Sequence, residues 1–291
     1  MGGTNSKWEY SDHPYAGRSA VLATMHGKLP LIGPVLENAI GMKVTDVSVN
    51  TDMFGTFTGD IERRESPLQT AIAKARLGIR SSGKSLGLAS EGSIGPDRAL
   101  PLIVSDEEIV VLVDDSSGLV VWESNTSFEI VKASASIRPG DTLGSFLKEA
   151  DFPQHMLTVR PNVGSIRPIW KGISELEVLE TAIRGCATAS SDGLALVQTD
   201  LRAHTCPSRQ KVIAGAAERL AILLKTRCPR CKAPGWGDTG RLFGVPCGWC
   251  GTEVQLPRAK IQSCAFCDFE LIEPIIGQET ADPSKCPFCN P

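Results

Sequence analysis

Residues 228–250 read CPRCKAPGWGDTGRLFGVPCGWC, two Cys-x-x-Cys pairs with fifteen residues between them. Two more pairs follow closer to the C-terminus, with eighteen residues between them. Both spacings are typical of a zinc site built from two cysteine knuckles. Four thiolates surround Zn²⁺ tetrahedrally and leave no open position, so such a site is structural rather than catalytic. The pattern predicts two structural Zn²⁺ ions in C-terminal tandem zinc ribbons, with the ligands Cys228, Cys231, Cys247, Cys250, Cys264, Cys267, Cys286 and Cys289.

The order of the knuckles favours sequential pairing, in which the first pair joins the second and the third joins the fourth. Only thirteen residues separate the second pair from the third, which disfavours an interleaved cross-brace. A disulfide framework is the other alternative. It is less favoured, because nothing marks the chain as secreted and disulfide scaffolds seldom carry four regular x-x pairs.

Composition indicates a folded protein with no general affinity for polyanions. The chain has 291 residues, is 42% hydrophobic and carries a formal net charge of −3. A net negative charge disfavours nucleic acid and anionic membranes as partners. The apolar runs are too short to span a bilayer, and the N-terminus has no apolar leader segment. We therefore expect a cytoplasmic protein with no membrane association.

The chain divides near residue 226, where cysteine, proline and glycine replace a pattern of alternating strands and helices. Residues 1–225 are expected to form an α/β domain, and residues 226–291 a double zinc-ribbon domain. We expect strands at 19–24, 44–49, 85–89, 109–113, 119–122, 156–159 and 194–197, with a hairpin joining 109–113 to 119–122. Helices are expected at 31–40, with Gly41 as its cap, from Ser66-Pro67 to about residue 80, and at 208–225.

Polar residues gather after several of these strands, where an open α/β sheet forms its ligand site. Thr24, His26 and Lys28 lie in a glycine loop before the first helix, a place suited to binding an anion. Asp52, Asp60 and Glu62 lie in a long polar loop and carry the hard oxygen ligands that Mg²⁺ prefers. In each case the alternative is an ordinary solvated loop.

Two later clusters complete the candidate pocket. The turn Ser90-Glu91-Gly92-Ser93 is expected to follow a short strand, and Glu91 is the best catalytic candidate there. Arg202, His204 and Arg209 lie at or just before the N-terminus of the last long helix. Arginine forks and a helix N-terminus both suit phosphate or carboxylate recognition. Caps and surface charges are the alternative explanation for this cluster.

Several strings resemble an uncharacterised bacterial family of unknown function with a C-terminal double zinc ribbon. They are Ala-Thr-x-His-Gly-Lys (23–28), Thr-Asp-x-x-Gly-Thr-Phe-Thr-Gly (51–59), Ala-Ser-Glu-Gly-Ser (89–93), Asp-x-Arg-Ala-His (200–204) and the final Cys-Asn-Pro (289–291). The resemblance covers essentially the whole chain and implies no particular activity.

Residues 1–225 also resemble, more distantly, the inosine triphosphate pyrophosphatase and Maf-like nucleotide hydrolases. In this resemblance Thr24 and Lys28 form the phosphate loop, and residues 69–75, including Lys74, match a helix motif. Residues 90–93 match the family's acidic turn, and residues 204–209 match its late His-Arg pair. The resemblance implies an inosine-triphosphatase-like mixed sheet with flanking helices. The family's helix carboxylate, a metal ligand, is Gln69 here, so a metal would depend on Asp52, Asp60 or Glu62.

Together these features predict that residues 1–225 bind, and hydrolyse with Mg²⁺ or Mn²⁺, a nucleotide or related phosphorylated small molecule. Catalysis would fall to Glu91, Asp52 and Glu62. The substrate would be bound by Thr24, His26, Lys28, Lys74, Ser90, Ser93, Arg202, His204 and Arg209.

The alternative function is a non-catalytic zinc-ribbon module that docks a protein or nucleic-acid partner. Residues 226–291 contain seven basic and seven acidic residues, and each Zn(Cys)₄ centre adds about two negative charges. This balance disfavours nucleic acid. Trp236, Phe243 or Trp249, if exposed, could still stack on bases or contact a protein.

Overall fold

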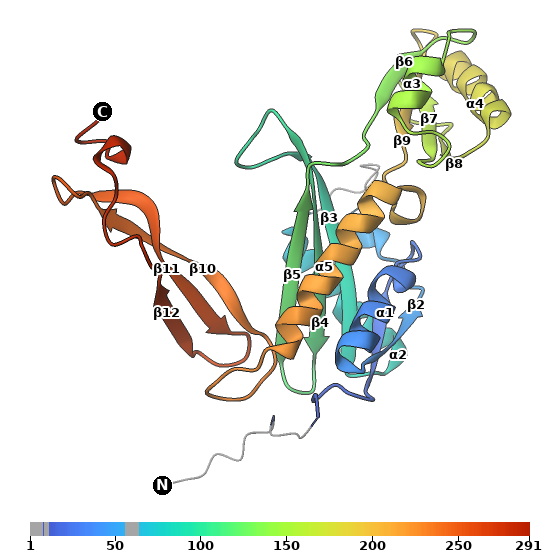
Figure 1. The fold of residues 1–291 in the computed structure, drawn as a ribbon. Helices are drawn as coiled ribbons and strands as arrows, with labels where there is room; N and C mark the ends of the chain where they lie inside the picture. Colours follow the sequence, from blue (N-terminus) through green and yellow to red (C-terminus); the bar gives the residue numbers. More distant parts are fainter. Residues whose placement is uncertain (1–7, 9–11, 56–63) are drawn as a thin grey trace.

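The computed structural model describes Trp8, residues 12–55 and residues 64–291, and they form three parts. A central α/β sheet carries a small lobe at one end of helix α5 and an arm of long strands at the other end (Figure 1). The small lobe is defined as residues 134–199 and the arm as residues 226–291. The mixed α/β class agrees with the sequence pattern.

The main sheet has five strands in the order β2-β1-β3-β4-β5. The first two connections are parallel, and β3 with β4 and β4 with β5 are antiparallel. The sheet is therefore mixed. Its strands are β1 (Ser19–Ala23), β2 (Lys43–Val47), β3 (Leu86–Pro96), β4 (Val104–Asp114) and β5 (Leu119–Ser127).

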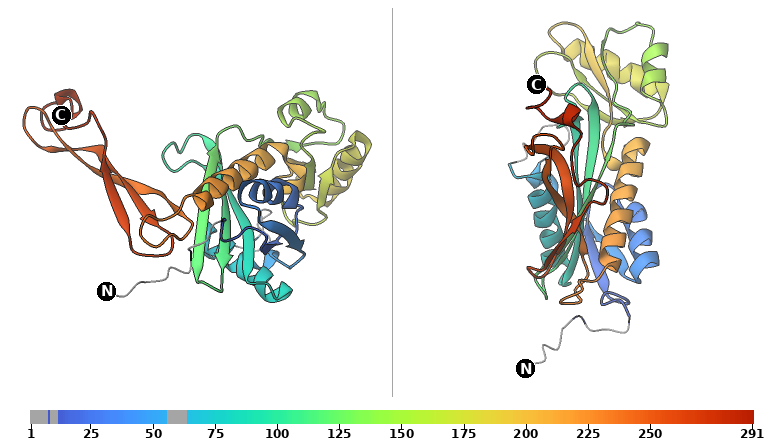
Figure 2. Two further views of the ribbon diagram at one scale, coloured as in Figure 1. Left: turned by 60° about the horizontal axis from the view of Figure 1, so that its bottom comes forward. Right: turned by 60° about the vertical axis from the view of Figure 1, so that its left-hand side comes forward.

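Helices cover both faces of this sheet (Figure 2). Helices α1 (Leu29–Ile40) and α5 (Pro207–Lys225) pack on one face, where Leu88 and Leu112 belong to the largest core cluster. Helix α2 (Pro67–Ser82) packs on the other face, against Ala89 and Val111. Neighbouring residues of β3 and β4 point to opposite faces because side chains alternate along a strand. A buried strand pair with helices on both sides therefore reads as continuous apolar sequence.

The helix ends follow the expected capping rules. Ser66 caps α2, its Oγ accepting a hydrogen bond from the backbone N–H of Gln69 at 3.3 Å, and Pro67 opens the helix. Gly41 closes α1 in the left-handed conformation, with φ of 69°. Such a cap favours glycine, because a side chain would be strained there.

The strand expected at 85–89 is much longer than predicted, and this corrects the proposed Ser90–Ser93 turn. Residues 86–96 pair continuously with 104–114, so Ser90 and Glu91 lie in the middle of β3. The partner strand β4 likewise begins at Val104 rather than at Ile109. Pairing between the two strands holds these polar residues in extended conformation. The sequence did not reveal this continuation of the strand, because the residues after Ala89 are no longer apolar.

The small lobe has its own sheet and its own core. Its four antiparallel strands have the order β6-β9-β7-β8, where β6 is Ser134–Ile137, β7 Leu157–Pro161, β8 Trp170–Ile173 and β9 Ala195–Thr199. Helices α3 (Gly144–Glu149) and α4 (Leu176–Ala189) bury residues such as Leu179 and Ile183 against this sheet. The sequence pattern predicted two of these strands and neither helix. The short turn η2 (Ala203–Thr205) leads from β9 to α5.

The arm is a three-stranded antiparallel sheet in the order β10-β11-β12. Strands β10 (Trp236–Pro246) and β11 (Glu253–Cys264) form a long hairpin, and β12 (Glu270–Pro274) pairs with the base of β11. Two short turns, η1 (Asp52–Phe54) and η3 (Pro283–Lys285), complete the described elements. Among the described residues, no helix is both long and apolar enough to cross a lipid bilayer.

Candidate functional site

The eight knuckle cysteines form two groups of four, one at each end of the arm. In each group the ligand atoms all lie within 4.8 Å of one another. Nearest sulfur pairs are 3.6 Å apart for Cys231 and Cys264 and 3.7 Å apart for Cys250 and Cys286. A regular Zn(Cys)₄ tetrahedron with Zn–S bonds of about 2.3 Å has sulfurs about 3.8 Å apart. A disulfide would need about 2.05 Å. Both groups therefore fit structural Zn²⁺.

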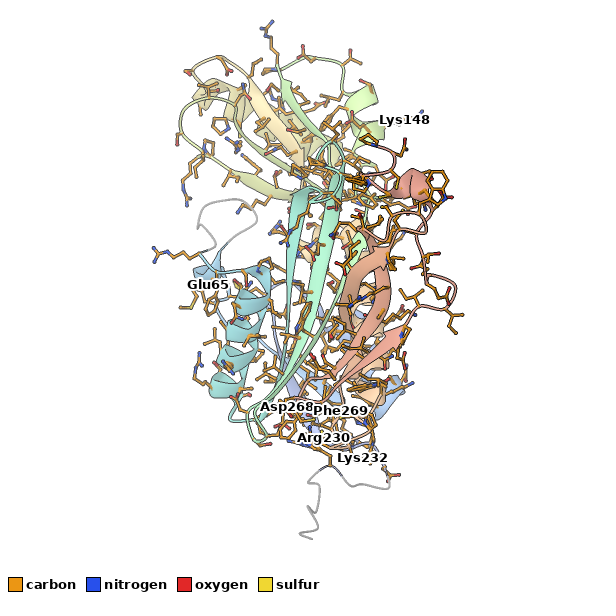
Figure 3. All side chains as sticks on the ribbon, turned by 90° about the vertical axis from the view of Figure 1, so that its left-hand side faces the viewer. Glu65, Lys148, Arg230, Lys232, Asp268 and Phe269 are labelled. Atoms are coloured by element: carbon orange, nitrogen blue, oxygen red, sulfur yellow. The ribbon has the colours of Figure 1, made fainter. Side chains whose placement is uncertain are left out.

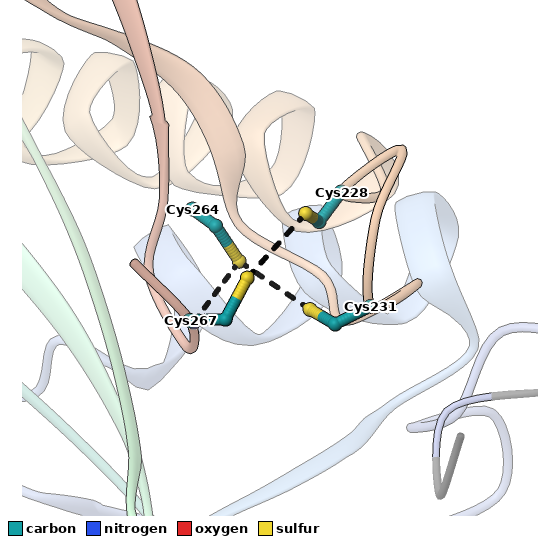
Figure 4. A group of neighbouring side chains, drawn as sticks. All are labelled: Cys228, Cys231, Cys264 and Cys267. Atoms are coloured by element: carbon teal, nitrogen blue, oxygen red, sulfur yellow. Dashed lines mark hydrogen bonds between the residues drawn. The ribbon is translucent and has the colours of Figure 1, made fainter. Parts of the chain in front are cut away.

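The expected sequential pairing is wrong, because the two sites are interleaved. Cys228 and Cys231 join Cys264 and Cys267 near the main sheet, and we call this the proximal site (Figure 4). The distal site, at the tip, combines Cys247 and Cys250 with Cys286 and Cys289. The cause is the β10–β11 hairpin, whose register places Trp236 opposite Cys264 and Pro246 opposite Glu253. The second knuckle thus lies a full strand length away from the first.

The proximal site is attached to the rest of the chain. Arg230 of the first knuckle forms an ion pair with Asp268 beside the third, with 3.3 Å between Nη1 and Oδ1 (Figure 3). Phe266, inside the third knuckle, packs edge-on against Trp8, with 5.6 Å between ring centroids. These contacts secure the base of the arm to the N-terminal segment.

The distal site instead presents aromatic side chains to solvent. Trp249 lies inside the second knuckle with 82% of its surface exposed, and Phe288 inside the fourth with 75% exposed. Phe243 is half-exposed. Trp236 is not available for stacking on a partner, because it is buried against Phe269 with 5.3 Å between ring centroids.

A second group of polar residues lies beyond the end of β1, at the edge of the main sheet. Strand β1 ends at Ala23, whereas its neighbour β3 continues past Leu88 along β4. The loop from Thr24 to Lys28 and the start of α1 therefore lie next to the exposed stretch of β3. We call the buried polar residues gathered here the edge cluster: Thr24, Lys28, Lys74, Ser90, Glu91, Asp106, Glu108 and Arg209.

Lys28 is buried, and its ammonium donates a hydrogen bond to a neutral group. Its Nζ lies 2.7 Å from Oγ of Ser90 in β3. Burial, with a smaller contribution from the positive charge of Arg209, lowers the pKa of Lys28 to about 8, against the opposing effect of Glu108 and Glu91. A buried cation with a lowered pKa is stabilised by a negative ligand.

Lys74 and Glu91 form a buried ion pair on the α2 side. Nζ of Lys74 lies 2.6 Å from Oε2 of Glu91, and both side chains are about one-tenth exposed or less. Lys74 therefore neutralises the carboxylate that we expected to be catalytic. Ser93, two residues further along β3, is exposed.

Arg209, in the first turn of α5, is buried and forms an ion pair with Oε1 of Glu108. Its Nη1 also donates to the backbone oxygen of Leu201 at 2.7 Å. Glu108 lies opposite Gly92 in the β3–β4 register, and a side chain at Gly92 would overlap this ion pair. Glycine is therefore required at position 92 for close approach rather than for a turn.

Asp106 lies two residues before Glu108 on the same face of β4. Neither of its oxygens has a hydrogen-bond partner among the described residues, and the same is true of Oε2 of Glu108. Burial, together with the negative charge of Glu108, raises the pKa of Asp106 to about 7. Sequence reasoning missed both carboxylates. The signal that could have revealed them is their position at alternate residues directly before an apolar strand segment.

Two histidines lie beside the edge cluster. The rings of His26 and His204 stack with 5.2 Å between centroids and 26° between planes. Burial lowers the pKa of His204, and so does the charge of Arg202. The expected Arg202 is engaged elsewhere, since its guanidinium binds the buried carboxylate of Asp200 with 2.6 Å between Nη2 and Oδ2.

The structure thus brings most of the expected pocket residues together from five elements. Thr24, Lys28, Lys74, Ser90, Glu91 and Arg209 join one buried cluster, with His26 and His204 next to it. The side chains of Asp52, Asp60 and Glu62 lie outside the described residues.

Comparison with known proteins identifies a family and structural likenesses. A search of the curated proteins gives no match. Among solved structures, protein VC0702 from Vibrio cholerae is similar at 12% identity and a TM-score of 0.30, over 70% of this chain and 93% of that one. A TM-score this low supports no conclusion. The family described as Domain of unknown function (DUF6671) matches residues 74–291, which include α2 from Lys74 onward, the strands β3 to β5 and both zinc sites. The chain therefore belongs to this family of unknown function, DUF6671.

Proposed function

We propose that the edge cluster binds a phosphorylated small molecule, such as a nucleotide, through the Lys28 ammonium. The observation that carries this proposal is the bond from Lys28 to Ser90. Buried lysines are usually paired with a carboxylate. Here Lys74 and Arg209 have carboxylate partners, whereas the direct partner of Lys28 is a hydroxyl. An anionic group would supply the missing charge.

The N-terminus of α1 supports the same assignment. Lys28 is the N-cap residue of this 12-residue helix, but no side chain caps it and no acidic residue occupies the first turn. Pro30 has no N–H and the N–H of Leu31 is bonded to the backbone oxygen of Lys28, so the contribution here is that of the helix dipole, which favours negative charge. A phosphate beside Lys28 would therefore meet both an ammonium group and the positive end of α1.

The more specific proposal is metal-dependent hydrolysis of that ligand, by a domain of the inosine-triphosphatase-like type. Support comes from the order of the segments: a phosphate loop after the first strand, then a helix with Lys74, then a strand with Glu91. In this scheme Lys28 and Arg209 stabilise phosphate charge. Glu91, oriented by Lys74, would position the attacking water. Electrostatic stabilisation of this kind is usually the largest contribution to phosphoryl-transfer catalysis.

Hydrolysis is tested by incubating the purified full chain with each common nucleoside triphosphate and Mg²⁺ or Mn²⁺, and measuring released phosphate and pyrophosphate. We expect turnover of at least one nucleotide and its loss in Glu91→Gln. Lys84→Met is the control, because Lys84 is half-buried and contacts Ser19 at the opposite end of β1. Absence of turnover with every nucleotide, or full activity of Glu91→Gln, would refute the hydrolysis proposal.

A second proposal concerns the arm, which we infer docks a protein partner through its tip. Trp249 and Phe288 favour it, because large aromatic side chains are enriched at protein interfaces and costly to leave exposed. Phe266, at the equivalent place of the proximal site, packs against Trp8 and is only 37% exposed. A photo-reactive residue at position 249 should cross-link a protein in the cells that make it, with position 122 as the control. Tight, salt-sensitive gel shifts lost in Trp249→Ala would instead assign the tip to nucleic acid.

A further inference from the structure

We propose that Asp106 and Glu108 bind a divalent cation, Mg²⁺ or Mn²⁺, inside the edge cluster. Both side chains belong to β4 and lie on the same face of the sheet, two residues apart. Both are fully buried, with 0% of their surface exposed. The inference rests on the proposed function only for the phosphate that would complete the coordination.

Three of the four carboxylate oxygens in this pair have no hydrogen-bond partner among the described residues. They are both oxygens of Asp106 and Oε2 of Glu108. The remaining oxygen, Oε1 of Glu108, takes the guanidinium of Arg209. A buried carboxylate without a partner is costly, and native proteins almost always compensate it with a proton, a hydrogen-bond donor or a metal.

Among the described residues, no cation forms a direct ion pair with Asp106, although Arg209 and Lys28 both act on it through space. Arg209 can neutralise one carboxylate, and it is bound to Glu108. Lys28 acts on Asp106 through space, but its direct bond goes to Ser90. Two carboxylates therefore share one bound guanidinium. A divalent cation between Asp106 and Oε2 of Glu108 would satisfy the three free oxygens at once.

The donor set and its surroundings suit Mg²⁺ or Mn²⁺. These ions bind through one or two carboxylates together with water and substrate phosphate, rather than in a complete protein cage. Lys28 lies close enough for its charge and that of Glu108 to influence each other. A phosphate bound by Lys28 would therefore lie near the cation. Glu91 lies on the other face of β3, where it forms an ion pair with Lys74.

The experiment is a titration of the full chain, with both zinc sites filled, by Mn²⁺ in buffer without any phosphate compound. Free Mn²⁺ is measured by electron paramagnetic resonance. We expect one Mn²⁺ site of submillimolar affinity that Asp106→Asn weakens about tenfold or more, as is typical for loss of a group that supports metal binding. The matched control is Asp115→Asn, the same change in the exposed turn at the other end of β4.

Asp106→Asn should fold, since it removes a buried charge, and circular dichroism checks this. The inference is overturned if the wild-type chain binds no Mn²⁺ at millimolar concentration, or if Asp106→Asn binds it as tightly as wild type. Phosphate binding by Lys28 is measured separately without metal. A failure of the metal site is thus distinguishable from a failure of the proposed function.

Discussion

The ammonium of Lys28 lies 2.7 Å from the hydroxyl of Ser90, joining the loop before α1 to the middle of β3 across 62 positions of sequence. This contact places a buried positive charge where β1 ends and β3 continues. The edge cluster forms around it.

Anion binding at this site should weaken as pH rises through about 8. Burial and the charge of Arg209 lower the pKa of Lys28 to about 8, so its ammonium loses its proton above that pH. An ordinary lysine would stay charged to about pH 10. The measurement is the affinity for inorganic tripolyphosphate between pH 6 and pH 9.5. A constant affinity across this range would contradict the role of Lys28.

The substitution Asp106→Asn should stabilise the metal-free protein at pH 7.5. The folded-state pKa of Asp106 is raised to about 7. Its protonated form is therefore stabilised by folding, and stability falls as pH rises from about 4 through 7. The gain in Asp106→Asn should be roughly 1–3 kcal/mol at pH 7.5 and should vanish near pH 4.

Urea unfolding at the two pH values, without added divalent metal, measures this gain. Asp115→Asn should change little at either pH, because position 115 is exposed. Equal loss of stability by Asp106→Asn at both pH values would show that Asp106 makes a structural hydrogen bond instead.

The pair Lys74 and Glu91 should show strong thermodynamic coupling. Removing one partner leaves the other charge buried, which costs about 3–5 kcal/mol. Lys74→Met alone should therefore destabilise the protein more than Lys74→Met combined with Glu91→Gln. Denaturant unfolding of the single and double variants gives the coupling energy. Additive effects would mean that the two charges do not interact.

Zinc stoichiometry should confirm the interleaved pairing. Replacing Cys228, Cys231, Cys264 and Cys267 by serine should leave one zinc per chain, because the distal site remains complete. Replacing Cys228, Cys231, Cys247 and Cys250 should leave none. Sequential pairing predicts the opposite result for each quadruple variant. Elemental analysis of the purified variants decides between them.

Features that depend on neighbouring residues were predicted well from the sequence, whereas features that depend on long-range pairing were predicted poorly. The Ser66 cap, the Gly41 cap and the apolar spacing of α5 predicted helices that begin and end close to where they are found. The knuckle spacing identified the eight zinc ligands. Their pairing depended on the β10–β11 hairpin, whose length is a property of strand pairing rather than of cysteine spacing.

The candidate site shows the same limit. Lys28, Glu91 and Arg209 were found because each stands beside a predicted strand or helix end. Asp106 and Glu108 were missed, because carboxylates interrupted the apolar pattern and the strand was expected to begin at Ile109. Pairing with β3 on one side and with β5 on the other holds this polar segment in β4. The small lobe was largely missed, because its short strands and helices lack strong caps.

The central claim is that Lys28 binds a phosphorylated ligand in the edge cluster. The most direct measurement is isothermal titration of the full chain with inorganic tripolyphosphate at pH 7, without divalent metal. We predict binding by wild type and by Lys84→Met, and affinity at least about tenfold lower in Lys28→Met, because a bond to a charged group contributes about 1.5–3 kcal/mol. No binding by wild type, or equal affinity of wild type and Lys28→Met, would contradict the account.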